Sequence, residues 1–255
     1  MRAYIGRNAR APIRIPRMNL LAIETATESC SAALLSDGRL LAHSELAPRR
    51  HAELLLPMCE ELLAEAGLKR RDLDAIAVGC GPGAFTGVRL AISAAQGIAL
   101  ALEIPVIAVS SLAALAMQAP DNGAAILAVI DARMGEIYAG TFRRTRDGLV
   151  EPIGAESVGE ANVLQLPEAS AWNVIGGGWA SYCEALIARL PAAPLWAEGE
   201  CYPQAVDVAR LAAPLARAGR GVAPEQALPV YLRDKVALTT AEQEAARKRS
   251  VGNRI

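Results

Sequence analysis

The stretch Gly79-Cys-Gly-Pro-Gly-Ala-Phe-Thr-Gly-Val-Arg-Leu90 determines how the rest of the chain is organised. Before it comes the apolar run 74–79, whose length and β-branched residues predict a buried strand. The first glycines of the stretch allow a sharp turn, because glycine adopts positive φ without a steric penalty. We expect an apolar helix over about 86–103, capped by the Thr86 hydroxyl, and then a second strand over 104–109. Together these elements form one β-α-β unit.

A glycine turn in front of a helix can bind phosphate, because free backbone N–H groups and the helix dipole favour anions. The spacing of Gly79, Gly81 and Ala84 also fits a loose dinucleotide fingerprint. Against this, Pro82 has no N–H to donate, and no acidic residue stands at the distance expected for ribose binding. The alternative is a tight turn needed only for packing, and the residues alone leave both interpretations open.

The composition indicates a soluble, well-packed α/β protein. The chain has 255 residues, of which 53% are hydrophobic, and a formal net charge of −1. This length suffices for one large domain or two smaller ones. No uninterrupted apolar run reaches the length of a membrane span. The five cysteines are scattered without a C-x-x-C spacing, which favours reduced cytosolic thiols over disulfides or a zinc site.

The two ends differ from the rest of the chain. Residues 1–17 contain five arginines and no acidic residue, which is also typical of nucleic-acid arms and targeting peptides. The run lacks the apolar core of a secretory signal, and Met18 stands directly before the first predicted strand. We therefore expect 1–17 to be a disordered or non-native extension, with Met18 as the true start. Residues 241–255 are interpreted as a charged, solvated tail.

Three strands are predicted before the first long helix. They cover 19–24, 30–36 and 39–46, and Asp37-Gly38 has the favoured composition of a hairpin turn. An amphipathic helix should follow over 51–67, where apolar residues recur at helical spacing and a glycine supplies the stop. The resulting order, β-β-β-α-β-α-β, differs from a Rossmann fold, in which a helix follows the first strand directly.

The second half repeats the mixture of strands and helices, although 150–166 has no clear pattern. A short helix over 111–118 precedes it. The predicted elements of the second half are paired strands over 124–131 and 136–142, a strand over 173–178 that enters a glycine turn and a helix, a helix over 202–218, and an extended segment over 229–232.

Several kinds of catalytic site lack their residues. The two histidines, His43 and His51, are too few for a histidine-rich metal site, and neither a G-x-S-x-G elbow nor a Walker A motif occurs. Glu24, Glu28 and Asp131 could form an acidic set at strand ends. Acidic residues at strand ends are also ordinary turn residues, so this set alone does not define a site.

Four segments together resemble the TsaB (YeaZ) family, which is needed for threonylcarbamoyladenosine in bacterial tRNA. They are 18–27, 81–90, 130–138 and 231–236. The likeness covers about 18–240, and the G-P-G-x-F-T-G-V-R run is highly specific. It implies an α/β chain with the actin/Hsp70/sugar-kinase-like (ASKHA) fold, built from two related subdomains that each have a mixed β-sheet flanked by helices. We expect these subdomains over 18–118 and 119–240.

The resemblance also implies a function without catalysis. The chain would be a cytoplasmic scaffold or activating subunit of the complex that makes N6-threonylcarbamoyladenosine at position 37 of ANN-decoding tRNAs. Its partners would be TsaD, the transferase subunit with which it forms a heterodimer, and the ATPase TsaE. Without TsaD it would form a homodimer, and it would meet tRNA only through the complex. No cofactor would bind it tightly, because ATP is used by its partners, and no membrane would be involved.

The residues at the family's functional positions favour this inactive role. The catalytic relative holds its metal with a histidine pair at i and i+4, where this chain has Ser111 and Leu115, and leucine cannot bind a metal. Ala26 stands where nucleotide-binding members of the fold place a glycine against the phosphates. We therefore expect no catalytic residue and no metal. The vestigial nucleotide-site residues would be Glu24, Thr25, Ala26, Thr27, Gly81, Gly83, Gly176, Gly177 and Gly178.

The partner surface is expected on the helices over 51–66 and 86–103, lying side by side and presenting apolar residues to helices of TsaD. The candidate contact residues are Leu54, Leu55, Met58, Leu62, Val88 and Ile92. The alternative is that these apolar stripes belong to the core.

Two other functions remain open. An ATP-dependent small-molecule kinase of the same fold would need Asp131 or Glu24 as a metal-holding acid. An independent RNA-binding module is indicated only by the arginine-rich ends.

Overall fold

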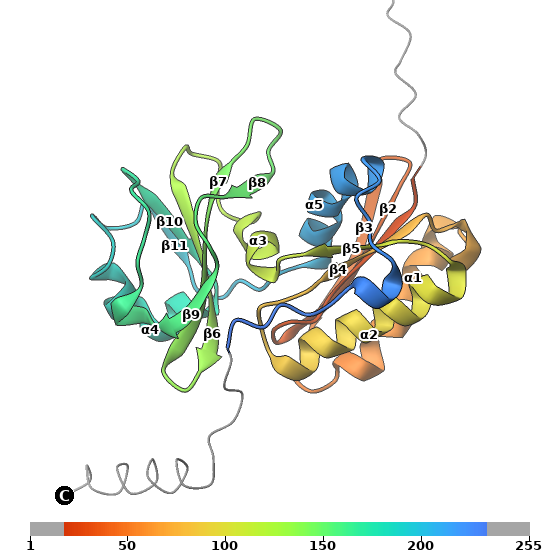
Figure 1. The fold of residues 1–255 in the computed structure, drawn as a ribbon, viewed down its shortest axis with the longest axis horizontal. Helices are drawn as coiled ribbons and strands as arrows, with labels where there is room; N and C mark the ends of the chain where they lie inside the picture. The colour runs from red at the N-terminus through yellow and green to blue at the C-terminus, as the bar shows by residue number, and fades with distance from the viewer. Residues whose placement is uncertain (1–17, 234–255) are drawn as a thin grey trace, which may run out of the picture.

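A computed structural model of the chain describes residues 18–233. The expectations for 1–17 and 241–255 lie outside these residues. The first of two sheets has five strands in the order β3-β2-β1-β4-β5 (Figure 1). The strands are β3 (Arg39–Leu46), β2 (Ser29–Ser36), β1 (Leu20–Glu24), β4 (Ala75–Gly79) and β5 (Val106–Val109). β2 runs antiparallel to β1 and β3, whereas β1, β4 and β5 are parallel.

The second sheet repeats this arrangement. Its order is β11-β10-β6-β7-β8, and the short strand β9 (Ser157–Glu160) pairs with β7. The strands are β6 (Ala125–Arg133), β7 (Glu136–Arg144), β8 (Val150–Pro152), β10 (Trp172–Ile175) and β11 (Trp196–Glu198). β6 is antiparallel to β7 and parallel to β10, as β1 is to β2 and β4. The expectation of two related mixed sheets flanked by helices is therefore confirmed.

Helices cover both faces of the first sheet. α1 (His51–Ala66) and α2 (Phe85–Leu102) lie on one face, and α5 (Ala205–Arg217) lies on the other (Figure 1). Side chains of the parallel strands alternate between the two faces, so Leu21 and Val78 pack under α1 and α2. Leu20 and Ala77 face α5 instead. These strands are therefore buried on both sides, as parallel strands in sheets usually are.

α5 changes the expected division of the chain. The range 119–240 was assigned to the C-terminal subdomain, yet α5 returns to the first sheet and buries Ala205, Val208 and Ala209 there. A second return is made by Val222, whose N–H and C=O pair with the backbone of Val106 on the edge strand β5. The physical reason is that, among the described elements, no other helix covers this face of the first sheet.

The second sheet has shorter helices. α3 (Ser111–Ala116) packs on the face that carries Ile126 and Ile130, and α4 (Gly177–Ile187) covers the face that carries Leu127. The segment between β8 and β10 forms β9 and a 3₁₀ turn, where the first half has the long helix α1.

The start of α2 differs from the sequence prediction. Thr86 was expected to cap the helix, but α2 already begins at Phe85, and its N-cap residue is Ala84, without a side-chain hydrogen bond. The reason is that the Ala84 N–H bonds the Ala26 carbonyl, which anchors the chain two residues earlier than predicted.

Among the residues that the structure describes, α2 is also the one helix long and apolar enough to span a membrane. The same test is met by helices that cover the core of a soluble protein, and α2 packs Val88, Ala91, Ile92, Ala95 and Ala99 on the first sheet.

Candidate functional site

The first turn of the chain and the glycine stretch pack backbone against backbone. The Ala84 N–H donates to the Ala26 carbonyl at 2.7 Å, and the Thr25 hydroxyl donates to the Gly87 carbonyl at 2.7 Å. A Cβ on Gly83 would overlap the Ala26 carbonyl oxygen, and one on Gly87 would overlap the Thr25 carbonyl oxygen. The glycines are therefore required for packing, the second of the two interpretations left open by the sequence.

Glu24 is enclosed at the end of β1. Its carboxylate accepts hydrogen bonds from the Ala26 N–H and the Ser111 hydroxyl, both at 2.7 Å, and leaves no room for a side chain on Gly79. Burial raises the pKa of this carboxyl, while the hydrogen bonds from Ser111, Ala26 and Thr25 oppose the rise. Glu24 thus serves as an internal hydrogen-bond acceptor.

The positions that would carry the histidine pair are sealed in the core. Ser111 is fully buried, and its hydroxyl donates a hydrogen bond to the Glu24 carboxylate. Leu115 is fully buried against the turn before α4, where a Cβ on Gly176 would lie 2.5 Å from its Cδ2 atom. Within residues 18–233, no three His, Cys, Asp or Glu side chains are grouped to hold a metal ion.

The second glycine turn also packs over a first strand. Gly176 has φ of +109°, and a Cβ there would overlap the Val129 carbonyl oxygen of β6. A Cβ on Gly178 would lie 2.9 Å from the Val129 Cβ, whereas Gly177 has open space around it. Gly176 and Gly178 are therefore explained by the close approach of this turn to β6.

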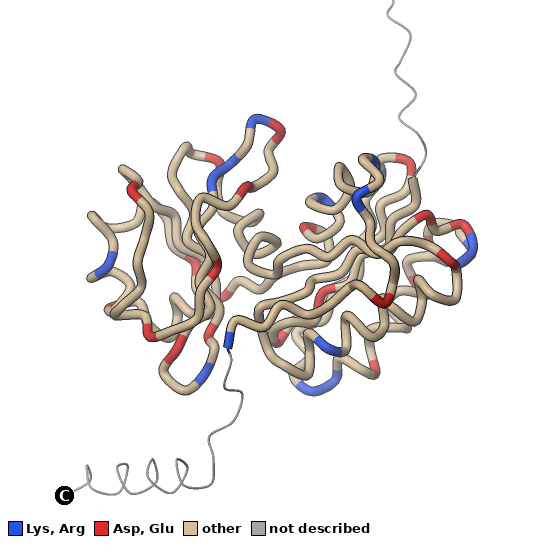
Figure 2. Tube along the Cα trace, in the orientation of Figure 1, with Lys and Arg blue, Asp and Glu red and all other residues tan. Residues whose placement is uncertain are grey.

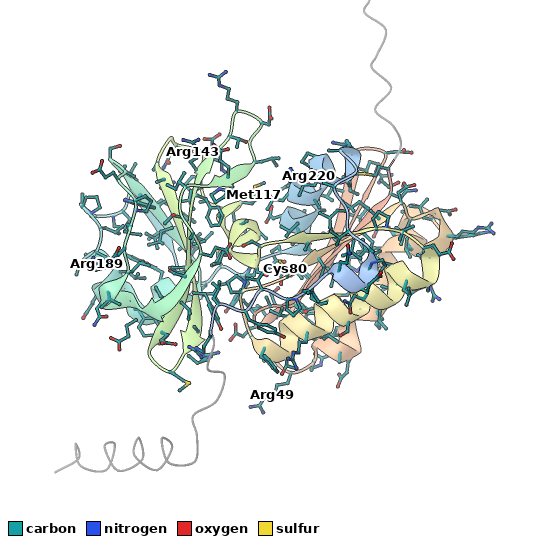
Figure 3. All side chains as sticks on the ribbon, viewed as in Figure 1. Arg49, Cys80, Met117, Arg143, Arg189 and Arg220 are labelled. Atoms are coloured by element: carbon teal, nitrogen blue, oxygen red, sulfur yellow. The ribbon has the colours of Figure 1, made fainter. Side chains whose placement is uncertain are left out.

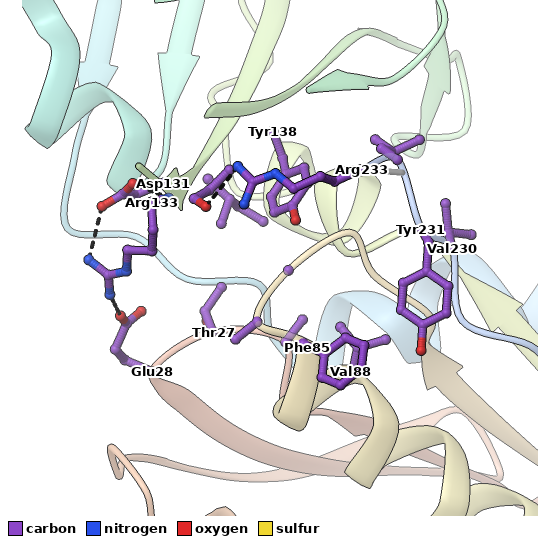
Figure 4. A pocket seen from close by; sticks show the side chains of 16 residues that line it. Thr27, Glu28, Phe85, Val88, Asp131, Arg133, Tyr138, Val230, Tyr231 and Arg233 are labelled. Atoms are coloured by element: carbon purple, nitrogen blue, oxygen red, sulfur yellow. Dashed lines mark hydrogen bonds and ion pairs between the residues drawn. The ribbon is translucent and has the colours of Figure 1, made fainter. Parts of the chain in front are cut away.

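A cleft of about 260 Å³ lies between the two subdomains. Its walls come from the turn after β1, the start of α2, the end of β6 and the segment 230–233 (Figure 4). Arg133 crosses one side of it, bonding Glu28 at 2.7 Å and Asp131 at 3.0 Å. Thr27 lines the cleft, and its hydroxyl oxygen is buried without a hydrogen-bond partner.

The acidic set considered from the sequence is therefore divided. Glu24 faces the interior, while Glu28 and Asp131 share Arg133 at the cleft. The link between Glu28 and Arg133 joins residues 105 positions apart, and the sequence analysis did not predict it. A local signal existed only for Asp131 and Arg133, which are two residues apart in one hairpin.

The six candidate contact residues of the partner surface lie in or against the core. Leu55, Met58, Leu62, Val88 and Ile92 are buried between the helices and the first sheet, and Leu54 is partly buried against the same cluster. These side chains fit the alternative interpretation, because each helix turns its most continuous apolar stripe towards the sheet. The partner surface itself stays a prediction, and other residues would have to form it.

The outward face of α2 has those other residues. Leu100 is 68% exposed, and Ser93, Gly97 and Ala101 beside it are exposed as well. The helix carries no charged residue between Arg89 and Glu103, whereas charges are spread over other parts of the surface (Figure 2). α1 contacts α2 and exposes Leu56. α2 thus presents an uncharged strip of small and apolar residues, and Leu56 of α1 adds exposed apolar area between the acidic residues Glu53 and Glu60.

Comparisons with known proteins cover both sheets. Residues 43–175 match the family model TsaD, tRNA N6-adenosine threonylcarbamoyltransferase. The tRNA threonylcarbamoyladenosine biosynthesis protein TsaB of Escherichia coli (strain K12) is 41% identical over 86% of this chain and 96% of its own. The protein of the same name from Haemophilus influenzae is 35% identical over 86% of this chain and 95% of its own. The solved structure of YeaZ from Pseudomonas aeruginosa, 46% identical, superposes with a TM-score of 0.78 over 84% of this chain and 100% of that chain.

Proposed function

This chain belongs to the TsaB (YeaZ) family and has the ASKHA fold, and we propose that it is a non-catalytic subunit of the machinery that makes threonylcarbamoyladenosine in tRNA. The observation that carries the proposal is that the residues at the family's nucleotide and metal positions make packing contacts inside this protein. The turn 24–27 is packed against Gly83 and Gly87, and the positions of the metal-binding pair, Ser111 and Leu115, are buried. The chain then contributes by binding a partner.

The partner is TsaD, the transferase subunit, and the binding surface is the outer face of α2 with the adjoining face of α1. Ser93, Gly97 and Ala101 are small, so a helix of the partner can approach the backbone closely. Leu100 and Leu56 supply exposed apolar area, which is favourable to bury. Because α2 is uncharged over 90–102, docking there desolvates no ion.

The same face would pair two copies of the chain when TsaD is absent, since a self-complementary patch generates a twofold dimer. In the assembly, TsaE joins as the ATPase, ATP is used by the partners, and tRNA is met only through the complex. The proposed assembly acts in the cytoplasm.

The test is reconstitution of threonylcarbamoyl transfer to tRNA with TsaD, TsaE, ATP and an activated threonylcarbamoyl donor, with and without this chain. We expect transfer only when the chain is present. Transfer by the chain alone, or full activity in its absence, would overturn the proposal. ATP turnover by the isolated chain would favour the kinase alternative instead.

The surface is tested by Leu100→Glu, measured as TsaD affinity by calorimetry. Placing a charge in the apolar contact should weaken binding by about tenfold or more, equivalent to about 1.4 kcal/mol. The matched control is Ile187→Glu, at a 47% exposed position near the end of α4 in the other subdomain, which should bind as the parent does. Equal affinities of the Leu100 variant and the parent would place the interface elsewhere.

A further inference from the structure

The last described segment, residues 227–233, runs from the first subdomain to the second, and we call it the C-terminal strap (Figure 1, blue). It begins firmly attached to the first subdomain. Ala227 is 1% exposed, and its carbonyl accepts a hydrogen bond from the Gln96 side chain of α2 at 3.0 Å. The Val230 N–H donates to the Cys80 carbonyl at 2.8 Å, and Cys80 lies at the centre of the molecule (Figure 3).

Tyr231 adds a side-chain contact at the start of α2. Its hydroxyl accepts a hydrogen bond from Arg89 Nε at 2.7 Å. The Arg89 guanidinium also lies 3.7 Å from the centre of the Phe85 ring, and the Phe85 and Tyr231 rings are 5.9 Å apart. Cation–π attraction of this kind contributes about 0.5–1 kcal/mol at exposed sites. The middle of the strap is therefore held by an aromatic and cationic cluster on α2.

Two residues later the strap binds the second subdomain. Arg233 donates to the Ala132 carbonyl at 3.2 Å (Figure 4). It also forms an ion pair with Glu136, so it holds the hairpin between β6 and β7. The Arg233 side chain is only 19% exposed, which shields this pair from solvent more than the exposed pair of Arg133 and Glu28. Sheltered charge-assisted hydrogen bonds are stronger than exposed ion pairs.

We propose that the C-terminal strap is a latch that fixes the angle between the two subdomains and so sets the width of the cleft. Val230, Tyr231, Leu232 and Arg233 form one wall of that cleft. Rotation of the second subdomain away from the first has to break the contacts of Arg233 with Glu136 and Ala132, or separate Tyr231 from Arg89. The ion pair of Arg133 and Glu28 also joins the subdomains, but it is more exposed and therefore the weaker link. The covalent connections through β5–α3 and β11–α5 act as hinges, and the strap removes the freedom that those hinges leave.

The experiment measures distances between the subdomains in the full chain by double electron–electron resonance. Spin labels are placed at Arg71→Cys and Arg146→Cys, which are exposed positions in the first and second subdomains. The partly buried Cys183 and Cys201 are changed to serine, while Cys30, Cys59 and Cys80 are buried and are left in place. Circular dichroism verifies that each variant is folded.

The decisive variant is Arg233→Gln, which removes the ion pair and leaves a neutral amide donor on a shorter side chain. We expect its distance distribution to broaden and to shift towards longer distances. The matched control is Arg143→Gln on β7, which breaks the ion pair with Glu151 inside one subdomain and should leave the distribution unchanged. A distribution for Arg233→Gln that superimposes on the parent, or an equal broadening in the control, would refute the latch.

Discussion

In both halves of the molecule the first strand lies between an antiparallel hairpin and two parallel strands, but the halves cover these sheets differently. The first half has α1 and α2, with 16 and 18 residues. The second has β9 with a 3₁₀ turn in place of α1, and the 11-residue α4, which is interrupted by non-helical backbone at Tyr182. The glycine turn over the first strand occurs in both halves. The features common to both halves, the strand order and the glycine turn, maintain the fold. The uncharged face of α2 that we propose to bind TsaD is found only in the first half.

The acids near the ends of β1 and β6 also differ in their surroundings. Glu24 ends β1 and is fully buried, with Ser111 as its donor. Asp131, near the end of β6, borders the cleft and bonds Arg133. One of these two acids is part of the core, and the other lies at the surface where the subdomains meet.

The largest expected effect tests whether both glycine turns depend on close backbone approach. Gly87→Ala, in the first turn of α2, and Gly176→Ala, in the turn before α4, each place a Cβ into a carbonyl group. These are the carbonyls of Thr25, directly after β1, and of Val129, inside β6, which cannot move without shifting the backbone of those strands. Overpacking of this kind costs about 1–3 kcal/mol and sometimes more, and the left-handed φ of Gly176 adds strain. We expect the free energy of unfolding of each variant, measured by urea denaturation, to be lower than that of the parent by about 3 kcal/mol.

The control for these two variants is Gly97→Ala on α2, where a Cβ meets nothing within 4 Å. It should raise the free energy of unfolding by about 0.5–1 kcal/mol, because alanine favours the helix. A loss in only one of the two turns would show that the halves are not equivalent in this respect.

A moderate effect concerns the buried acid of the first half. Because burial raises the pKa of Glu24 above 4.5, the folded state holds this proton more tightly than the unfolded state. Its stabilising contribution is complete below about pH 4.5 and is lost as the pH rises through the folded-state value. We expect Glu24→Gln to flatten the fall of the unfolding free energy over that interval.

Ser111→Ala should change the same curve in the opposite direction. The Ser111 hydrogen bond lowers the pKa of Glu24, so its removal extends the decline to higher pH. Urea titrations at a series of pH values measure both variants. Parallel curves for the parent and Glu24→Gln would show that this carboxyl does not govern the pH dependence.

The smallest expected effect compares the hairpin turns of the two sheets. The β2–β3 turn has Asp37 and Gly38 at its positive-φ positions, which suit those residue types. The β6–β7 turn places Arg133 and Met134 in the left-handed region, and Met134 is 63% exposed. Met134→Asn should raise the unfolding free energy by less than about 1 kcal/mol, since asparagine tolerates this conformation. A lower denaturation midpoint would mean that Met134 has a role beyond its turn.

Much of the fold was predictable because its signals are local. The strands 39–46 and 75–79, the turn at Asp37-Gly38 and the stop of α1 at Gly67 follow from periodicity and turn chemistry over a few residues. The resemblance then supplied the pairing of the two halves, which periodicity alone does not give.

The rest depends on tertiary contacts that no local pattern carries. On α1, Leu54, Leu55 and Leu56 are adjacent in sequence, but their burial differs because the sheet touches only one side of the helix. The return of α5 to the first sheet and the contact of Arg233 with Glu136 likewise join segments far apart in the chain. The apolar residues could be predicted, but their orientation could not.

The position of α5 has a consequence for how the protein is made. This helix covers Leu20, Ala22 and Ala77 but is encoded near the end of the described chain. During synthesis, one apolar face of the first sheet therefore stays uncovered after β5 is complete, until more than a hundred further residues, up to the end of α5, have been added. A chain truncated before Ala205 would keep this apolar face exposed and would therefore be prone to aggregate.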